Sequence, residues 1–408
     1  MYPNLYYAVK GLFGVDIGWL RAVPTFGFFM MGAFLAAGAV FRVELRRKAS
    51  EGLMGYEEEE VRVRRRTAEA ARERLDADGV REGMAARGDM GGADAESEGV
   101  REDAGDEVRG AARDERERED AGRADESGEW EERVIRVWAY DRVGEFMVLA
   151  VVFGFLGAKL FNGLENWNAL MRDPIGTLLS LSGLTFYGGL IFATLAIWWY
   201  ARRHHIPLRP LNDAAAPMLA LAYAIGRLGC HFSGDGDWGI LNTAYTSMAT
   251  GKVAPMPGGV ETFNDFGSIR HWSVRAPSWL PDGLFASCYP HNINNVGLRL
   301  SNCVGDHCMY LPSPVFPTSV YESLMGLLIF GVLWFLRRRL RVPGALFCWY
   351  LVLMGVERLL IEQIRVNAVF ELFGWRLTQA ELISAGLVLA GGVGLIVLGR
   401  RPREEFKI

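Results

Sequence analysis

The stretches LALAYAIGRLGCHFSGDGDWG (residues 219–239) and LVLMGVERLLIEQIRVN (residues 351–367) each place an arginine, Arg227 and Arg358, inside apolar sequence. An arginine at the centre of a membrane helix costs about 2.5 to 3.5 kcal/mol on insertion scales. Two such residues predict a buried anionic partner or a polar cavity. A lipid phosphate is the natural candidate, because a guanidinium group binds phosphate through paired, charge-assisted hydrogen bonds.

Apolar and charged residues are segregated along the chain. Half of the 408 residues are hydrophobic, yet 44 Lys and Arg accompany 48 Asp and Glu. Apolar runs of membrane-spanning length lie at about residues 22–44, 146–166, 178–200, 211–232, 317–337, 344–364 and 378–399. We therefore predict an all-α integral membrane protein with seven transmembrane helices.

Basic clusters indicate the orientation of these helices, because all of them fall on the same predicted side of the membrane. The clusters are residues 46–48, 202–203, 337–341 and 400–403. The positive-inside rule then predicts that the N-terminus and a loop at 233–313 lie outside and that the C-terminus is cytoplasmic.

Five segments are expected along the chain. They are an interfacial segment with the first transmembrane helix (1–50), a charged cytoplasmic insert (51–135), helices two to four (136–232), an exterior loop domain (233–313) and helices five to seven with a cytoplasmic tail (314–408). The first twenty residues lack the features of a cleaved signal peptide, and Tyr6, Tyr7 and Trp19 favour a position near the lipid headgroups.

The two inserts differ in composition. About half of the residues in 51–135 are charged and most others are Ala and Gly, which predicts a disordered or partly helical loop. Its nearly balanced charges argue against a nucleic-acid-binding arm. The 233–313 loop is rich in turn residues and predicts a small irregular domain, in which two of Cys288, Cys303 and Cys308 can pair. No metal-ligand spacing or nucleotide fingerprint is present, so no metal or cofactor is expected.

Several motifs, in order, resemble those of the bacterial prolipoprotein diacylglyceryl transferase family. They are TFYGGLIF (185–192) for its His-Gly-Gly-Leu motif, AAPMLALAYAIGRLGCHFSGDGDWG (215–239) for its signature, FPTSVYES (316–323) for its His-Pro-Ser-Gln-Leu-Tyr-Glu motif, and GVERLLIEQIRV (355–366) for its Arg-x-x-x-Glu-x-x-Arg helix. The resemblance covers all seven predicted helices and neither insert.

This resemblance implies an enzyme of the bacterial cytoplasmic (inner) membrane. Members of the family transfer a diacylglyceryl group from phosphatidylglycerol to the lipobox cysteine thiol of an exported preprolipoprotein and release glycerol phosphate. The implied partners are phosphatidylglycerol, preprolipoprotein signal peptides and membrane lipids. Fixed cations suit this reaction because the departing phosphate gains charge as the carbon–oxygen bond breaks.

Arg227 and Arg358 match arginines of the family motifs and are predicted to bind the phosphate and to act in catalysis; the alternative is a structural salt bridge. Arg358, Glu362 and Arg365 are spaced i, i+4, i+7 and share one helix face. Glu362 either orients one of these two arginines or forms a purely structural pair.

Further residues complete the predicted substrate site. Gly226 and Gly229 allow close helix approach, for which packing is the simpler explanation. Lys159 adds positive charge, or its side chain only extends to the membrane interface. Tyr321 and Glu322 are retained from the family motif.

The sequence GDGDWG (234–239) is one residue longer than the family pattern, so either Asp235 or Asp237 can correspond to the family's single acid. We assign Asp235 a catalytic role and Asp237 a substrate-binding role, against the alternative of an ordinary Gly and Asp turn.

Tyr187 stands where the family has the histidine usually proposed to activate the thiol. A free thiol has a pKa of about 8.5 and tyrosine about 10, so tyrosine is a poor general base at neutral pH. Either the cationic field of Arg227 lowers the pKa of the thiol, or His231, one helical turn after Arg227, supplies the base. We favour the field, since His231 has the simpler alternative of a structural hydrogen bond.

Other positions also depart from the family pattern and leave fewer polar side chains in the predicted pocket. They are Phe26, Cys230, Ser233 and Met354. They leave two rival readings of function. One is a paralogue that transfers a phospholipid-derived group to another acceptor, and the other is a non-enzymatic lipid-binding or transport protein. Retention of both membrane arginines argues against the second.

Overall fold

The computed structural model describes residues 1–64, 130–179, 185–256, 270–301, 303, 305–367, 369–372 and 375–400. It divides into a larger unit, Met1–Gly55 with Trp138–Ile408, and a smaller unit, Tyr56–Val137. The larger unit holds every residue that the sequence places in the candidate site.

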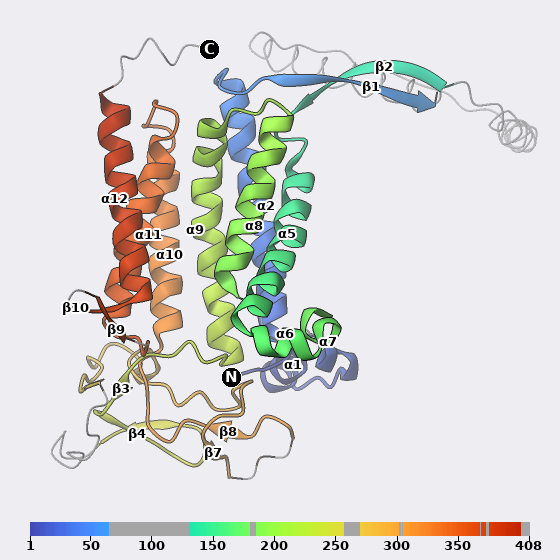
Figure 1. The fold of residues 1–408 in the computed structure, drawn as a ribbon. Helices are drawn as coiled ribbons and strands as arrows, with labels where there is room; N and C mark the ends of the chain where they lie inside the picture. The colour runs from blue at the N-terminus through green and yellow to red at the C-terminus, as the bar shows by residue number, and fades with distance from the viewer. Residues whose placement is uncertain are drawn as a thin grey trace, which may run out of the picture. The chain divides into compact units, whose positions relative to one another are not determined.

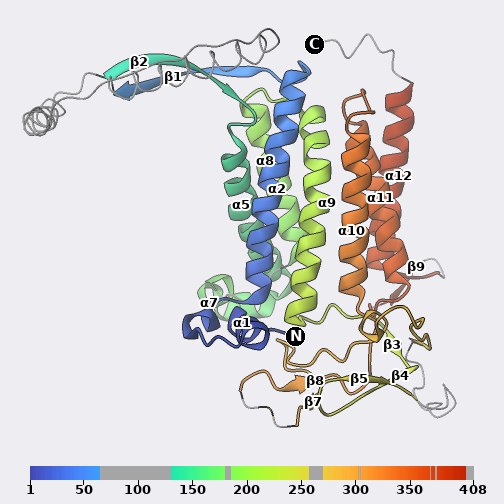
Figure 2. The same cartoon turned by 180° about the vertical axis from the view of Figure 1, so that it is seen from behind.

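Long helices standing side by side dominate the larger unit (Figure 1, Figure 2). Four of them are long and apolar enough to cross a membrane: α2 (Thr25–Ser50), α5 (Val143–Glu165), α10 (Thr318–Leu336) and α12 (Gln379–Gly399). The chain is therefore a mostly helical, multi-pass membrane protein. Beside them run α8 (Phe186–Arg203), α9 (Leu208–Ser233) and α11 (Ala345–Glu362), and each predicted apolar run overlaps one of these seven helices.

Two glycines bring α5 and α8 into close contact. A Cβ atom added at Gly157 would clash with the carbonyl oxygen of Gly188, and one added at Gly188 would clash with that of Gly157. Small residues at such crossings let helix backbones approach each other in a membrane. Phe161 and Phe192 pack edge to face beside the crossing, with ring centroids 6.4 Å apart.

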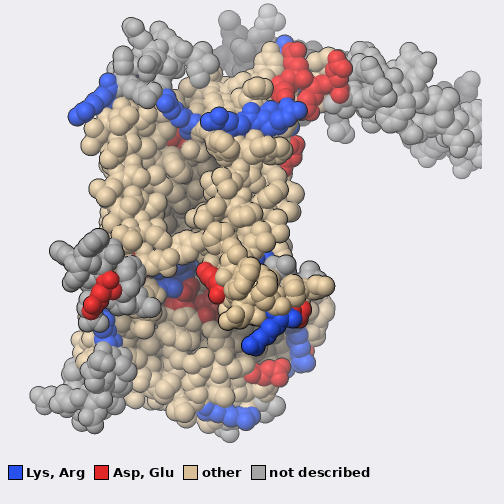
Figure 3. Space-filling model, viewed as in Figure 1, with Lys and Arg blue, Asp and Glu red and all other residues tan. Residues whose placement is uncertain are grey.

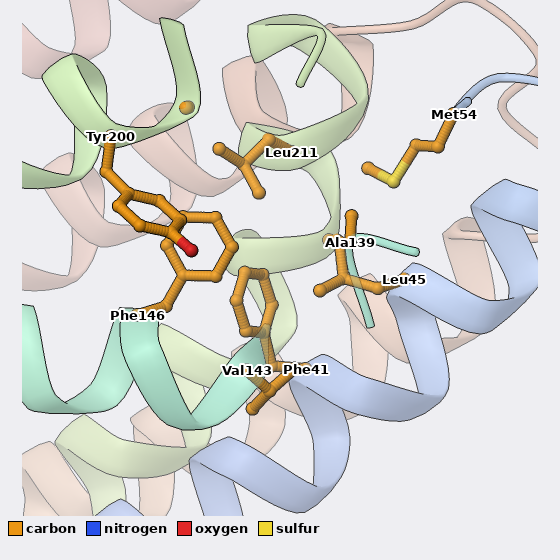
Figure 4. Packing of buried hydrophobic residues seen from close by; sticks show 10 residues of the cluster. Phe41, Leu45, Met54, Ala139, Val143, Phe146, Tyr200 and Leu211 are labelled. Carbon is orange, nitrogen blue, oxygen red and sulfur yellow. The ribbon is translucent and has the colours of Figure 1, made fainter. Parts of the chain in front are cut away.

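An apolar cluster joins α2, α5, α8 and α9 near the end of the bundle where α2 terminates (Figure 4). Phe146 lies at its centre and contacts Phe41 and Tyr200 edge to face, at centroid distances of 5.8 and 5.2 Å. Leu45 and Leu211 complete the contact between α2 and α9. These apolar contacts hold the first long helix against helices that follow much later in the sequence.

Two buried ion pairs lie at the same end of the bundle. Lys48 Nζ is 3.2 Å from Asp213 Oδ2, and Glu44 pairs with Arg337. Asp213 also accepts hydrogen bonds from the backbone N–H groups of Gly344 (2.8 Å) and Phe347 (3.0 Å) at the start of α11. Polar side chains from α2, α9 and α10 therefore fasten four helices together at this end.

The segment between α9 and α10 is here called the loop domain (residues 234–317), and the strands in its described residues are short. They are β3 (Leu241–Asn242) parallel to β6 (His271–Trp272), β4 (Tyr245–Ser247) antiparallel to β5 (Val253–Pro255), and β7 (Leu298–Arg299) antiparallel to β8 (Met309–Tyr310), with a 3-10 turn at Asp282–Leu284. Asn242 is fully buried and donates its amide to the carbonyl oxygens of Val274 and Phe285. The Asn242 side chain therefore holds segments of the loop domain together through hydrogen bonds to their backbone.

Cysteine pairing, which the sequence left open, is resolved in the loop domain. Cys303 and Cys308 form a disulfide, and Cys288 is a buried free thiol.

Shorter elements complete the described chain. They are α1 (Leu5–Phe13) and a 3-10 turn (Gly18–Ala22) before α2, α6 (Trp167–Arg172) and α7 (Pro174–Leu179) after α5, and the antiparallel hairpin of β9 (Val369–Leu372) and β10 (Trp375–Thr378) before α12. Near the N-terminus the ring of Tyr6 is buried beneath Arg21, whereas Trp19 is exposed.

In the smaller unit, strands β1 (Tyr56–Arg64) and β2 (Trp130–Trp138) pair in a two-stranded sheet. The composition predicted disorder or helix here, so the two ends of the charged insert differ from that expectation. Residues 65–129 lie outside the described part of the chain, and the prediction for them stays untested.

Candidate active site

Three arginines meet on one buried carboxylate. Glu322 of α10 accepts hydrogen bonds through Oε1 from Arg358 (2.9 Å) and Arg365 (3.2 Å), and its Oε2 lies 3.4 Å from Nε of Arg227. Arg227 comes from α9, Arg358 from α11, and Arg365 from the turn that follows α11. The prediction that Arg365 shares one helix face with Arg358 and Glu362 is therefore wrong, because α11 ends at Glu362. We call these three side chains the arginine cluster; residues far apart in the sequence form it.

Asp237, in the loop domain, binds two members of the arginine cluster. Its two carboxylate oxygens bind Arg227 and Arg365. Burial acts to raise the pKa of Asp237, but the positive charges of the two arginines outweigh burial and hold that pKa below its ordinary value. The segment can turn back onto the cluster because α9 ends at Gly234, whose φ of 65° lies in the left-handed region that favours glycine.

Asp235 lies in a different environment from Asp237. It accepts a hydrogen bond from the backbone N–H of Asp237 (3.4 Å), and burial raises its pKa. Cys230 Sγ and one carboxylate oxygen each of Asp235 and Asp237 lie within 4.8 Å of one another, close enough to share a metal ion. The positive charges of the two guanidinium groups that bind Asp237 oppose the binding of a metal ion at this position.

Glu362 contacts Arg358: its Oε2 lies 3.5 Å from Nη2 of that arginine, one helical turn away. Its other oxygen accepts a hydrogen bond from the Asn367 amide at 2.6 Å. This contact fits both alternatives that the sequence left open, a carboxylate that orients Arg358 and a purely structural pair.

The arginine side chains of the site are more exposed than the carboxylates of Glu322 and Glu362. The side chains of Arg227, Arg358 and Arg365 retain 18%, 24% and 14% exposure, against 0% for Glu322 and 1% for Glu362. Figure 3 shows the surface hollowed between the helices on the α10–α12 side and those on the α8–α9 side, with charged atoms visible at the foot of the hollow. An anion entering the site would meet guanidinium groups whose partners Glu322 and Glu362 are buried, beside Asp237, which is 26% exposed.

The predicted glycines differ in their surroundings. A Cβ atom at Gly229 would lie 2.9 Å from Cβ of Phe29, so α9 and α2 approach closely there. At Gly226 the nearest atom would be Met30 Sδ, at 3.7 Å, which is ordinary contact. The predicted close approach therefore applies to Gly229 and not to Gly226.

Tyr321 and Lys159, two other predicted residues, have different surroundings from the arginine cluster. Tyr321 donates its hydroxyl hydrogen to the carbonyl oxygen of Leu284, which ties α10 to the loop domain. Lys159 is only 3% exposed and lies on α5, whose close neighbour is α8 rather than the helices of the arginine cluster. Its burial does not match a side chain that extends to the interface.

Tyr187 begins α8 at 36% exposure, with its ring edge to face against Phe186. No described contact joins Tyr187 to the arginine cluster.

His231 bridges two elements at the end of α9. Its Nδ1 lies 3.5 Å from the hydroxyl of Tyr289 in the loop domain and 3.5 Å from that of Ser319 on α10. The two hydroxyls are 3.4 Å apart. These contacts give His231 hydrogen-bond partners for a structural role, and its role as a base stays a prediction.

We expect His231→Gln to leave turnover within about threefold of wild type, whereas loss of a general base would cost about a hundredfold or more. Losing these hydrogen bonds should lower the free energy of unfolding by about 1 kcal/mol. Initial rates from pH 6 to 8 and thermal melting of the same preparation measure both effects. A hundredfold loss with intact lipid binding would instead make His231 the base.

Sequence reasoning missed two polar side chains beside the cluster, Tyr223 of α9 and Glu357 of α11. The Tyr223 ring lies under the Arg227 guanidinium, 5.3 Å from ring centre to Cζ, and its hydroxyl donates to Glu357 at 3.1 Å. A signal was available, because Glu357 is a carboxylate inside an apolar run directly before Arg358.

Comparison with known proteins adds independent information. The sequence model of the family described as prolipoprotein diacylglyceryl transferase matches residues 127–397. A phosphatidylglycerol–prolipoprotein diacylglyceryl transferase of Dehalococcoides mccartyi is 28% identical over 270 residues, which cover 65% of this chain and 80% of the relative. Its counterpart in Mycobacterium leprae is 28% identical over 262 residues (63% and 67%), and that in Xylella fastidiosa 31% over 252 residues (60% and 72%).

Proposed function

Because this chain belongs to the prolipoprotein diacylglyceryl transferase family, we propose that it transfers a diacylglyceryl group from phosphatidylglycerol to the lipobox cysteine of exported preprolipoproteins. The observation that carries the proposal is the arginine cluster: three partly exposed guanidinium groups gathered on the fully buried Glu322. Phosphatidylglycerol offers a matching phosphate, and the partner substrates are preprolipoprotein signal peptides.

The arginine cluster has the properties that the reaction needs. The thiol sulfur forms a bond to the terminal glycerol carbon of the diacylglyceryl group, the carbon–oxygen bond to phosphate breaks, and glycerol phosphate leaves with the electron pair. Arg227, Arg358 and Arg365 are held by Glu322, Glu362 and Asp237, so they need little reorganisation as negative charge grows on the phosphate. Arginine rather than lysine suits this task because its planar group binds two phosphate oxygens at once.

We place the protein in the bacterial inner membrane with seven transmembrane helices, the N-terminus and loop domain outside and the C-terminus in the cytoplasm. The basic residues at the ends of α2, α8 and α10 support this orientation, because those helices end on the side of the bundle opposite the loop domain (Figure 1). The 51–135 insert is then cytoplasmic, and the arginine cluster lies towards the outer face, where exported substrates arrive.

Transfer is tested with purified protein in lipid vesicles, phosphatidylglycerol labelled in its acyl chains and a synthetic lipobox peptide, with the products identified by mass. We expect a diacylglyceryl mass on the peptide cysteine and release of glycerol phosphate. Transfer only to another acceptor would favour a divergent paralogue. Lipid binding without any turnover would favour a non-enzymatic lipid-binding protein.

We expect the smaller unit to be dispensable for transfer. Replacing Tyr56–Val137 with a short Gly and Ser linker should keep activity within about twofold, because loop-closure free energy changes slowly with loop length. On either side of the deletion, Met54 and Ala139 remain packed in the apolar cluster of the larger unit. The peptide assay and membrane insertion of the deleted protein check this. Loss of transfer in a normally inserted protein would give the insert a role in activity.

A further inference from the structure

Glu357 stands apart from the other buried carboxylates of the site. It is 1% exposed, its Oε1 accepts the hydrogen bond from Tyr223, and its Oε2 is buried with no hydrogen-bond partner. Within the described residues no Lys, Arg or His lies in ion-pair range of it. The Oε2 atoms of Glu322 and Glu362 also lack hydrogen bonds, but each has a guanidinium nitrogen within 3.5 Å.

Tyr223 connects this carboxylate to the arginine cluster. It lies one helical turn before Arg227 on α9, its ring packs against that guanidinium, and its hydroxyl reaches across to α11. The ring is partly buried, not fully enclosed. Tyr223 therefore joins the predicted phosphate site to a carboxylate that has no ion-pair partner among the described residues.

The proposed reaction needs a group that takes the thiol proton. Asp237, Glu322 and Glu362 are each engaged by arginine, so a proton on any of them would weaken an ion pair that shapes the site. Tyr187 is not joined to the cluster by a described contact, and His231 is engaged by Tyr289 and Ser319. Glu357, like Asp235, can take up a proton without breaking an ion pair, and of the two it is Glu357 whose hydrogen-bond partner, the Tyr223 side chain, packs against Arg227.

We propose that the Tyr223–Glu357 pair is the proton acceptor for the substrate thiol. The proposal rests on the transfer reaction proposed above. The thiol gives its proton to the oxygen of Tyr223 while Tyr223 passes its own proton to Glu357, and the sulfur forms its bond to the glycerol carbon. The carbon–oxygen bond breaks with its electron pair moving to the phosphate beside the arginines. Glu357 returns the proton to water when the products leave.

The test compares wild type, Glu357→Gln, Tyr223→Phe and the double variant in the peptide assay between pH 7 and 9. Glutamine keeps the size and hydrogen-bonding ability of Glu357 but cannot accept a proton at these pH values. We expect each single variant to lose about a hundredfold in rate at pH 7. The loss should shrink towards pH 9, because a free thiol ionises by itself with a pKa of about 8.5.

The double variant should be no slower than the slower single variant, because the two residues act in one transfer. Glu145→Gln, a partly exposed glutamate at the start of α5, is the control and should keep the wild-type rate. Binding of phosphatidylglycerol vesicles should be unchanged in every variant. The charged or titratable groups that act on Glu357 from outside the pair are Arg227, Glu322, Arg358 and Tyr350, and all four stay unaltered.

Three outcomes would overturn the assignment while leaving the proposed function intact: near-normal activity of Glu357→Gln at pH 7, an equal loss at every pH together with a lower melting temperature, and a loss that grows with pH. The second is the signature of a structural hydrogen bond, and the third that of a proton donor to the phosphate. A wild-type protein that modifies no lipobox peptide would instead overturn the proposed function and, with it, this inference.

Discussion

Arg227→Ala is expected to reduce diacylglyceryl transfer by about a thousandfold or more, because it removes a charged donor from the place where negative charge grows on the phosphate. The fold should survive. Glu322 keeps its contacts with Arg358 and Arg365, and Asp237 keeps Arg365, so no buried carboxylate of the cluster is left without a cation. Rates with labelled phosphatidylglycerol and the amount of inserted protein measure the two effects separately.

Two variants sharpen this prediction. Arg227→Lys should recover only a small part of the lost rate, since an ammonium group cannot reproduce the paired contacts of a guanidinium. Arg202→Ala removes an exposed arginine at the far end of α8, where it stacks on Trp198, and should leave the rate unchanged. Full activity of Arg227→Ala would show that Arg227 serves only as a structural ion-pair partner.

Glu322→Leu should be the most damaging change to the site as a whole. One buried carboxylate contacts all three arginines, so its removal leaves three positive charges in the interior with only Asp237 and Glu362 to balance them. Removing one partner of a buried ion pair typically costs about 3 to 5 kcal/mol. We expect loss of transfer together with a clearly lower melting temperature, in contrast to Arg227→Ala.

Glu322→Gln separates charge from shape in this prediction. The amide keeps the volume and one oxygen acceptor but loses the negative charge, so stability should recover in part while transfer remains low. Glu371→Gln, an exposed glutamate of β9, serves as the matched control. A Glu322→Leu protein that melts and turns over like wild type would contradict the role of this carboxylate as the anchor of the arginine cluster.

The sequence predicted the helices and the arginines for a simple physical reason. Charged side chains are costly in a membrane, so Arg227 and Arg358 stood out against their apolar neighbours. The partners of these arginines were less visible, because the contact between Glu322 and Arg227 depends on how α9 and α10 are rotated against each other. A pattern within one helix cannot supply that rotation.

Other details depended on three-dimensional contacts in the same way. The extra residue in GDGDWG left Asp235 and Asp237 equivalent in sequence, whereas the turn at Gly234 brings Asp237 between two arginines. The sequence analysis overlooked Glu357, although the membrane cost of a charged side chain, which singled out Arg358, applies equally to Glu357. The strands β1 and β2 were missed because the high density of charge in YEEEEVRVR and in the rest of the insert was interpreted as a disordered or partly helical loop.

The buried ion pairs between α2 and later helices also bear on the order of biosynthesis. Lys48 is separated by 165 residues from Asp213, and Glu44 by 293 residues from Arg337. At about 5 to 20 residues per second, these separations correspond to waits of roughly 10 to 30 s and roughly 15 to 60 s before each partner is synthesised. Contacts of α2 with α9 can form as soon as α9 has been made. The Glu44–Arg337 pair can form only after the ribosome has made α10, which makes this pairing a late step in maturation.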